Sequence, residues 1–330
     1  MDDGTRIEAA GNSLVQPLSA GILASLVGFA SSVPVLVAGL TAAGASPAEA
    51  ASGLFAICLA VAVLGIGLSV RSRMPVTIAW STPGAALLVS TGTPTGGYPA
   101  TVAAFLAAAA LIVVAGLWKP FGRAVAAIPM SLANAMLAGI LLELCLAPLK
   151  AVEAMVARRF LRRFAVPISV VVTAIIVVSA TTIPPAALAA SLPKPILVLP
   201  AFDLNAIIGI GLPLFLVTMA SQNVTGLAVL NANGYRPAVG PIFTLTGLAS
   251  IVTGLFGGHT VNLAAITAAL CAGPEAGADP ARRWIASVAC SVTYLLLGFG
   301  AAFAAAFIAA SPPLLIQAVA ALGLLRSLAS

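Results

Sequence analysis

Charged residues are what this sequence lacks most. Asp, Glu, Lys and Arg make up 7% of the 330 residues, whereas hydrophobic residues make up 61%. Soluble domains carry about 25% charged and about 45–50% apolar residues, and the mean hydropathy of this chain is +1.14. A chain so poor in charge cannot cover a water-exposed surface. The composition therefore excludes a soluble domain and predicts an integral membrane protein.

Patterns that support catalysis or metal binding are also missing. The cysteines lie in apolar stretches without CxxC or Cys/His spacing, which predicts packing residues at Cys58, Cys145, Cys271 and Cys290. No nucleophile, metal cluster or paired carboxylate falls in the middle of an apolar stretch. We therefore expect no catalytic residue, no metal and no cofactor, and we expect that the protein is not an enzyme.

A basic face for nucleic acid is absent too, although the net charge is +6. The 15 basic residues fall between the apolar stretches instead of on one surface, which is typical of the positive-inside rule. We expect no nucleic acid partner and a cytoplasmic N-terminus. In that orientation the basic loop residues can lie inside, with Lys194 as the main exception.

Long apolar stretches are what the sequence has in abundance. A helix needs about 20 residues to cross the hydrocarbon core, and in lipid the backbone must bond to itself. Reading the apolar runs between Pro, Gly and charged residues predicts helical spans at 17–39, 48–70, 100–118, 124–146, 164–183, 204–230, 237–255, 284–310 and 312–326. The fold class is thus an all-α polytopic membrane protein, whose partner is the lipid bilayer.

Two further segments, 75–91 and 259–272, are apolar but short and rich in Thr, Ser, Asn, Gly and Pro. We interpret each as a broken span in which an extended piece leads into a half-helix. In the first, Ser81 or Thr82 is the expected N-cap and Pro83 the first helical residue. In the second, Asn262 is the expected cap before an alanine-rich helix.

An internal repeat pairs the two broken spans. Residues 26–47 match 216–237 without gaps, and the aligned positions include Gly44 with Gly234 and Pro47 with Pro237. Each copy is followed by an SGL or TGL tripeptide and then by one broken span. The chain is therefore expected to contain two related halves.

The loop charges require seven crossings in the first half, so the second half is expected to enter the membrane inverted. A sixth span has little room between Arg123 and Arg158, and the second half stops early by comparison with the first. We expect a short sixth span and two missing terminal spans. The expected divisions are a core domain (14–118), a gate domain (119–200), a second core half with the eleventh span (204–310) and an incomplete gate (311–330).

Several motifs together resemble a known family: AWSTPGAALL from Ala79, PLFLVTMASQN from Pro213, FGGHTVNLAAITAALCAGPEA from Phe256 and DPARRW from Asp279. They are similar to the BenE-type benzoate permeases, relatives of the uracil permease and anion-exchanger superfamily. The resemblance covers most of the chain. It implies a 7+7 inverted-repeat fold with core and gate domains, in which the third span of each half is the broken one.

The function that the resemblance implies is proton-coupled uptake of benzoate or a similar aromatic carboxylate across the bacterial inner membrane. Its expected partners are the carboxylate, protons and a second copy of the chain in a homodimer. Two alternatives stay open. One is transport of another organic or inorganic anion on the same fold, and the other is a membrane binding protein that no longer transports because gate helices are missing.

Benzoate needs positive potential for its carboxylate and an apolar slot for its ring. Half-helix N-termini can supply the potential without a basic side chain. The expected substrate-binding residues around the two half-helix termini are Ser81, Thr82, Gly84, Asn262 and Leu263. Trp80 and Phe29 are the expected aromatic lining, or packing residues, and Ser31 either shapes the site or allows close helix approach.

Gln222 and Asn223 lie in the middle of the eighth span, where amides need partners. Related nucleobase permeases use this span for polar substrate contacts, so we expect both to bind substrate; the alternative is interhelical packing. For proton coupling the candidates are His259, the single histidine, and Glu143. An imidazole titrates near pH 6.5 in water, which suits a proton-coupled switch. A solvated or capping histidine is the alternative for His259, because the GGH sequence opens a segment near one membrane face.

Overall fold

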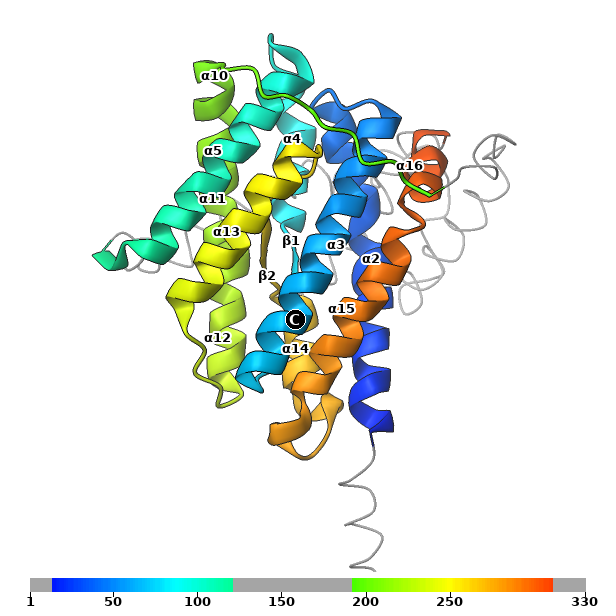
Figure 1. The fold of residues 1–330 in the computed structure, drawn as a ribbon, viewed down its shortest axis with the longest axis vertical. Helices are drawn as coiled ribbons and strands as arrows, with labels where there is room; N and C mark the ends of the chain where they lie inside the picture. The colour runs from blue at the N-terminus through cyan, green and yellow to red at the C-terminus, as the bar shows by residue number, and fades with distance from the viewer. Residues whose placement is uncertain (1–13, 121–191, 311–330) are drawn as a thin grey trace, which may run out of the picture.

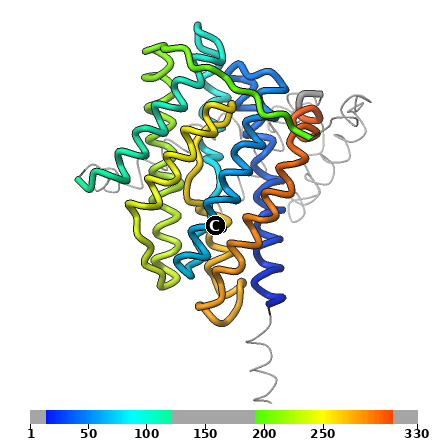
Figure 2. Tube along the Cα trace, viewed as in Figure 1, coloured from blue at the N-terminus to red at the C-terminus, as the bar shows by residue number. Residues whose placement is uncertain are grey.

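The computed structural model describes residues 14–120 and 192–310, which form a helical bundle around one pair of short strands (Figures 1 and 2). The expected spans at 124–146, 164–183 and 312–326 lie outside these ranges. So do Cys145, Glu143, the short sixth span and nearly all of both expected gate segments.

The first described part contains three long helices and a broken segment. Its elements are α2 (Val15–Ala42), α3 (Pro47–Ser72), β1 (Ile78–Trp80), α4 (Thr82–Thr91) and α5 (Gly97–Leu117). Helix α3 begins with a capping box, in which Ser46 and Glu49 each bond the other's backbone amide, so two otherwise free N–H groups are satisfied. The segment predicted as extended and then helical is β1 followed by α4.

The second described part repeats this order. One helix from Leu204 to Ala232 is followed by α13 (Val239–Leu255), β2 (Val261–Leu263), α14 (Ile266–Ala272), two 3₁₀ turns, η3 (Pro274–Ala276) and η4 (Pro280–Arg282), then α15 (Trp284–Gly298) and α16 (Ala301–Ala310). The first helix comprises α10 (Leu204–Ala206), η1 (Ile207–Gly211), α11 (Leu212–Thr218), η2 (Met219–Val224) and α12 (Thr225–Ala232). Its η1 and η2 turns are π-helical, a local widening that is frequent at functional sites.

Four of these helices are long and apolar enough to cross a membrane: α2, α3, α5 and Leu204–Ala232. The span expected at 284–310 consists of two helices, because the chain bends by 64° between α15 and α16. The bend falls at Gly298 and Gly300, and glycine is a weak helix former. Helix α13 is shorter, at 17 residues.

The packing of the two parts also repeats. Helix α5 lies against α13, and α15 lies against α3. Helix α15 also packs on α2, as α5 packs on η1 and α11. Strands β1 and β2 pair antiparallel at the centre, with Ala79 opposite Asn262, and α4 and α14 leave them in opposite directions (Figure 1).

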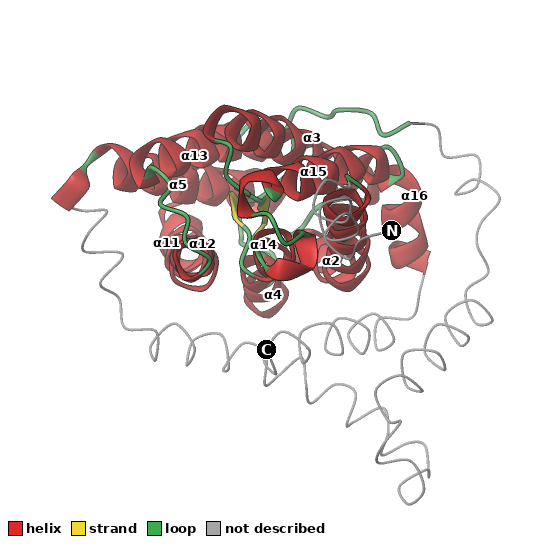
Figure 3. Ribbon diagram, turned by 90° about the horizontal axis from the view of Figure 1, so that it is seen from below, coloured by secondary structure: helices red, strands yellow, loops and turns green. Residues whose placement is uncertain are grey.

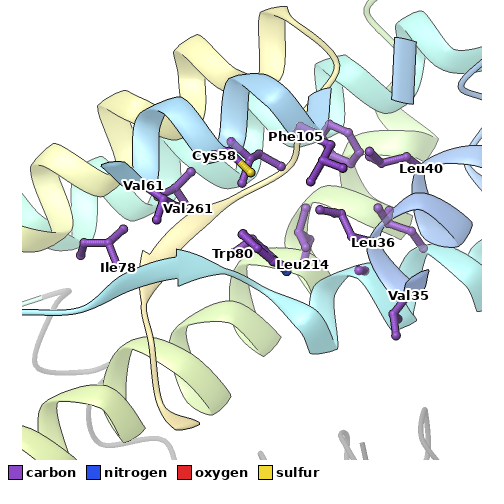
Figure 4. Close-up of a cluster of buried hydrophobic side chains, with 14 of the residues drawn as sticks. Val35, Leu36, Leu40, Cys58, Val61, Ile78, Trp80, Phe105, Leu214 and Val261 are labelled. Carbon is purple, nitrogen blue, oxygen red and sulfur yellow. The ribbon is translucent and has the colours of Figure 1, made fainter. Parts of the chain in front are cut away.

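The hydrophobic core surrounds the strand pair and draws on both parts of the chain. Figure 4 shows β1 crossing a cluster of buried side chains from several helices. Its labelled members are Val35, Leu36, Leu40, Cys58, Val61, Ile78, Trp80, Phe105, Leu214 and Val261. Close helix approach completes the core: a Cβ at Gly39 of α2 would overlap the Ala85 backbone of α4, so only glycine fits there.

The two ends of the bundle carry different charges. At one end, Arg73 stacks on Trp284 with 4.5 Å from guanidinium to ring. There the Tyr235 hydroxyl donates to the Pro280 carbonyl at 2.8 Å, so the loops after α3, α12 and α14 meet. Arg71 in the last turn of α3 lies at this end, and the loops carry Arg73, Arg236, Arg282 and Arg283 beside Glu275 and Asp279. Lys194 lies in the segment that crosses the opposite end, where Ile196 bonds to Ser52 near the start of α3.

Arg283 is the buried member of this basic group. Its Nε donates to the Gly277 carbonyl at 2.8 Å and its Nη1 to the Ala272 carbonyl at 2.9 Å. The second bond places a positive charge at the C-terminus of α14, where the helix dipole is negative. Arg283 therefore fixes the end of α14 that lies away from the strands.

Candidate functional site

The strand pair is the centre of the candidate site. Each strand is three residues long, so most of its backbone groups depend on partners from the other part of the chain. Beyond the ladder, Ala264 N–H donates to the Thr77 carbonyl at 3.0 Å. In an apolar environment, backbone N–H and C=O groups outside a helix persist only where other protein groups bond to them. At the strand pair, both parts of the chain provide these partners.

The N-cap of α4 is one of the two predicted residues, but the helix begins at Thr82, so Pro83 is its second residue and not its first. Ser81 is the N-cap, and its Oγ accepts the Gly84 N–H at 3.0 Å. Ser81 is fully buried, whereas Thr82 is half-buried and is not the cap. A Cβ at Gly84 would lie 2.5 Å from Leu214 Cδ1 and 2.8 Å from Ser81 Oγ. The absence of a side chain at Gly84 therefore brings α11 close to the start of α4.

Asn262 does not cap α14, so that prediction is wrong. Residue Ala265 is the N-cap of α14, and no side chain caps this helix. Asn262 lies instead within β2. With its amide turned so that both ends are satisfied, Oδ1 accepts the Ser81 N–H at 2.9 Å and Nδ2 donates to the Leu263 carbonyl at 2.8 Å; the Ser81 N–H also points to the Thr260 carbonyl at 3.4 Å. Asn262 bonds to the backbone of the other broken segment instead of to the first turn of α14. The local sequence does not reveal this distant partner. Asn262 links β2 to the start of α4.

Asn223 ties the same strand to the long helix on its other side. Its Oδ1 accepts the Leu263 N–H at 2.9 Å, and its Nδ2 donates to Met219 Sδ at 3.1 Å. Asn223 is fully buried. Leu263 is therefore held at both its N–H and its carbonyl by side-chain amides, and β2 is fixed to η2.

Gln222 differs from its neighbour. It lies on the π-helical turn η2 and is half-buried. No hydrogen bond joins its side chain to another residue in ranges 14–120 and 192–310. Gln222 thus has no side-chain partner among the described residues, whereas the amides of Asn223 and Asn262 bond within the protein.

The elements that carry these residues border one face of the bundle. Figure 3 shows α4 and α14 between α2 on one side and α11 with α12 on the other. We call the side of the bundle on which α4 and α14 lie, between α2 and α11 with α12, the half-helix face. Four of the predicted site residues on α2, α4 and η2 are half-buried: Phe29, Ser31, Thr82 and Gln222. Elements from different parts of the chain thus lie side by side here, and each carries predicted site residues.

An aromatic group extends inward from Phe29. The Phe29 and Trp80 rings meet edge to face at 6.3 Å, and Trp80 meets Tyr294 at 5.1 Å. Trp80 is 2% exposed, and its Nε1 donates to Ser32 Oγ at 3.1 Å. Ser31 instead bonds within its own helix, to the Val27 carbonyl at 2.8 Å. Ser32, not Ser31, is therefore the serine of α2 that contacts the strand pair.

Sequence reasoning did not find Tyr294. It lies on α15, in a charge-free stretch that gives no local hint of a site. The available signal was the rarity of tyrosine, which occurs three times in the chain. Because a buried phenol needs a polar partner, such a residue in an apolar stretch indicates a specific contact.

His259 is fully buried just before β2, so the solvated alternative is wrong. Its Nδ1 lies 3.1 Å from the Thr260 carbonyl oxygen. A carbonyl accepts only, so Nδ1 carries the proton and Nε2 the lone pair. Nε2 has no hydrogen-bond partner among the described residues. The imidazole therefore has one unused proton-accepting atom beside the strand pair.

Two cysteines lie close together beside the strand pair, where Cys271 hydrogen-bonds to Cys290 and to Thr77. Within the described ranges, no three His, Cys, Asp or Glu side chains form a group that could hold a metal ion. Cys58, Cys271 and Cys290 are buried free thiols. The chemistry at the strand pair is therefore hydrogen bonding and aromatic contact.

Apolar spanning helices, short central strands that both halves supply, and half-helices that begin at those strands define a polytopic membrane transport protein. The chain belongs to the BenE family, described as benzoate membrane transport protein, whose family model matches residues 12–330. This confirms the resemblance drawn from the motifs. Since the family is one of membrane transport proteins, the chain is not an enzyme.

Two relatives align over 323 residues, which is 94% of this chain and 82% of each relative. The inner membrane protein YdcO of Escherichia coli strain K12 is 36% identical. The benzoate membrane transport protein of Acinetobacter baylyi is 32% identical.

Proposed function

We propose that the protein takes up benzoate or a similar aromatic carboxylate together with a proton across the bacterial inner membrane. The observation that carries the proposal is membership in the BenE family. It is supported by the half-buried Gln222 amide and by the contact of the Phe29 and Trp80 rings. Moving one proton with each monovalent carboxylate transfers no net charge, so the membrane potential does not oppose uptake.

The carboxylate binds near the start of α4 in this proposal. Pro83 has no N–H, and Ser81 engages the Gly84 N–H, which leaves the Thr82 N–H and the positive end of the helix dipole for an anion. The Gln222 amide donates a second hydrogen bond. The ring packs on Phe29, with Trp80 behind it, so each chemical part of benzoate meets a matching group.

The transport movement that we propose uses a 7+7 inverted repeat. The segments 14–118 and 204–310 form the core, and 119–200 and 311–330 belong to the gate. This is supported by the repeated element order and by the paired packing of α5 on α13 and α15 on α3. One end of the bundle carries five arginines, which fits a cytoplasmic placement of that end and of the N-terminus. They are Arg71, Arg73, Arg236, Arg282 and Arg283.

Uptake into proteoliposomes tests the proposal. Purified protein is reconstituted, and labelled benzoate is added with and without an inward proton gradient. We expect accumulation only with the gradient. Uptake that does not depend on the gradient would reject proton coupling. A competition series with unlabelled anions separates benzoate from another substrate: if an aliphatic or inorganic anion blocks uptake better than benzoate does, the substrate assignment fails.

Gln222→Ala is expected to weaken benzoate binding about fivefold, because one partly solvated hydrogen bond contributes about 1 kcal/mol. Thermal stability should not change, since the amide bonds to no described residue. Calorimetric titration in detergent measures the affinity. The matched control is Asn231→Ala, an exposed amide on α12 of the same long helix, which should bind as the wild type does. Equal affinities in all three proteins would remove Gln222 from the site.

A further inference from the structure

Tyr294 is a buried aromatic residue to which no role in the site has been assigned so far. It is 1% exposed and lies on α15, behind the half-helix face. A Cβ added to Gly28 of α2 would overlap the Tyr294 hydroxyl and would lie 3.0 Å from Thr267 Cγ2 of α14. The phenol therefore fills the space between α2 and α14 that glycine leaves open.

Trp80 is held in place from three sides. Ser32 accepts its N–H at 3.1 Å, Phe29 packs on it at an interplanar angle of 82°, and Tyr294 packs on it at 61°. The three aromatic rings form a series from half-buried Phe29 to fully buried Tyr294. Because protein interiors are close-packed, Trp80 cannot move away from Phe29 unless Tyr294 gives way.

We propose that Tyr294 is a specificity-determining positioning residue, which limits the depth of the ring site by holding Trp80 against Phe29. The inference rests on the proposed function, in which the substrate ring packs on Phe29. With Tyr294 present, the site accepts a single aromatic ring. Without the Tyr294 ring, Trp80 withdraws toward α15. The space that opens between Trp80 and Phe29 then admits a second fused ring of the substrate.

The test compares benzoate with 2-naphthoate, an aromatic carboxylate one ring larger. Both affinities are measured by calorimetric titration of wild type, Tyr294→Ala and Tyr294→Phe in detergent. We expect the ratio of naphthoate to benzoate affinity to rise about tenfold or more in Tyr294→Ala, since small changes in pocket size alter discrimination by this order. Tyr294→Phe keeps the ring against Trp80 and should keep the wild-type ratio within about twofold.

A general loss of stability lowers both affinities together and does not change their ratio, so the ratio separates positioning from a merely structural role. If Tyr294→Ala does not fold, Tyr294→Leu takes its place, because it also removes the ring but keeps more apolar volume. An unchanged ratio in a folded variant lacking the ring overturns the inference. If the wild type binds neither carboxylate, the proposed function fails instead.

Discussion

Asn223→Leu is expected to reduce benzoate affinity about 100-fold and to lower the melting temperature. The substitution keeps the side-chain size but removes the Oδ1 atom that accepts the Leu263 N–H. In the apolar interior that N–H has no alternative partner, and an unsatisfied buried donor costs about 3 kcal/mol. Since β2 carries Asn262, which bonds to Ser81, the loss displaces the start of α4 as well.

Thermal unfolding and calorimetric titration in detergent measure the two effects. Asn231→Leu is the matched control, because it makes the same chemical change on α12 at an exposed position. It should leave both quantities at their wild-type values. If Asn223→Leu binds benzoate as tightly as the control does, then the attachment of β2 to η2 has no part in the site.

His259→Gln is expected to reduce gradient-driven uptake at least about tenfold while leaving benzoate exchange in place. Glutamine is polar and of similar reach, but it does not take up a proton in the physiological range. Of the two coupling candidates, His259 is the one that the structure describes, and its Nε2 has no hydrogen-bond partner among the described residues. Exchange of labelled for unlabelled benzoate needs no net proton movement, so it should continue.

The control for this substitution is Ser291→Ala. Within the described ranges, Ser291 Oγ is the other buried side-chain atom without a hydrogen-bond partner, and it lies on α15 against Gly65. Its removal should change neither exchange nor gradient-driven uptake. Gradient-driven uptake at the wild-type rate in His259→Gln would exclude His259 as the coupling residue.

The features that sequence alone predicted are those fixed by local chemistry. Ser81 and Pro83 define the start of α4 through contacts within four residues, and apolar length defines α2, α3 and α5. The repeat correctly placed one broken segment in each half. These signals do not depend on what another part of the chain does.

The features that sequence missed depend on distant partners. Asn262 was assigned as a cap from its position before an alanine-rich helix, yet its partner is Ser81, in the other half. Tyr294 and Ser32 meet Trp80 from two further helices. The bend between α15 and α16 was missed because the apolar composition continues through Gly298 and Gly300. The roles of Gln222 and Phe29 in binding stay predictions.

The pairing of β1 with β2 constrains how the protein can be made. A ribosome delivers β1 long before β2, and until Val261–Leu263 arrives the backbone of Ile78–Trp80 lacks its ladder. Lipid cannot supply those hydrogen bonds. The first broken segment must therefore wait in a hydrated place, at the insertion machinery or at the membrane surface, and enters its final position only after the second half is synthesised. Insertion of this segment is thus a late step of biogenesis, which follows the synthesis of β2.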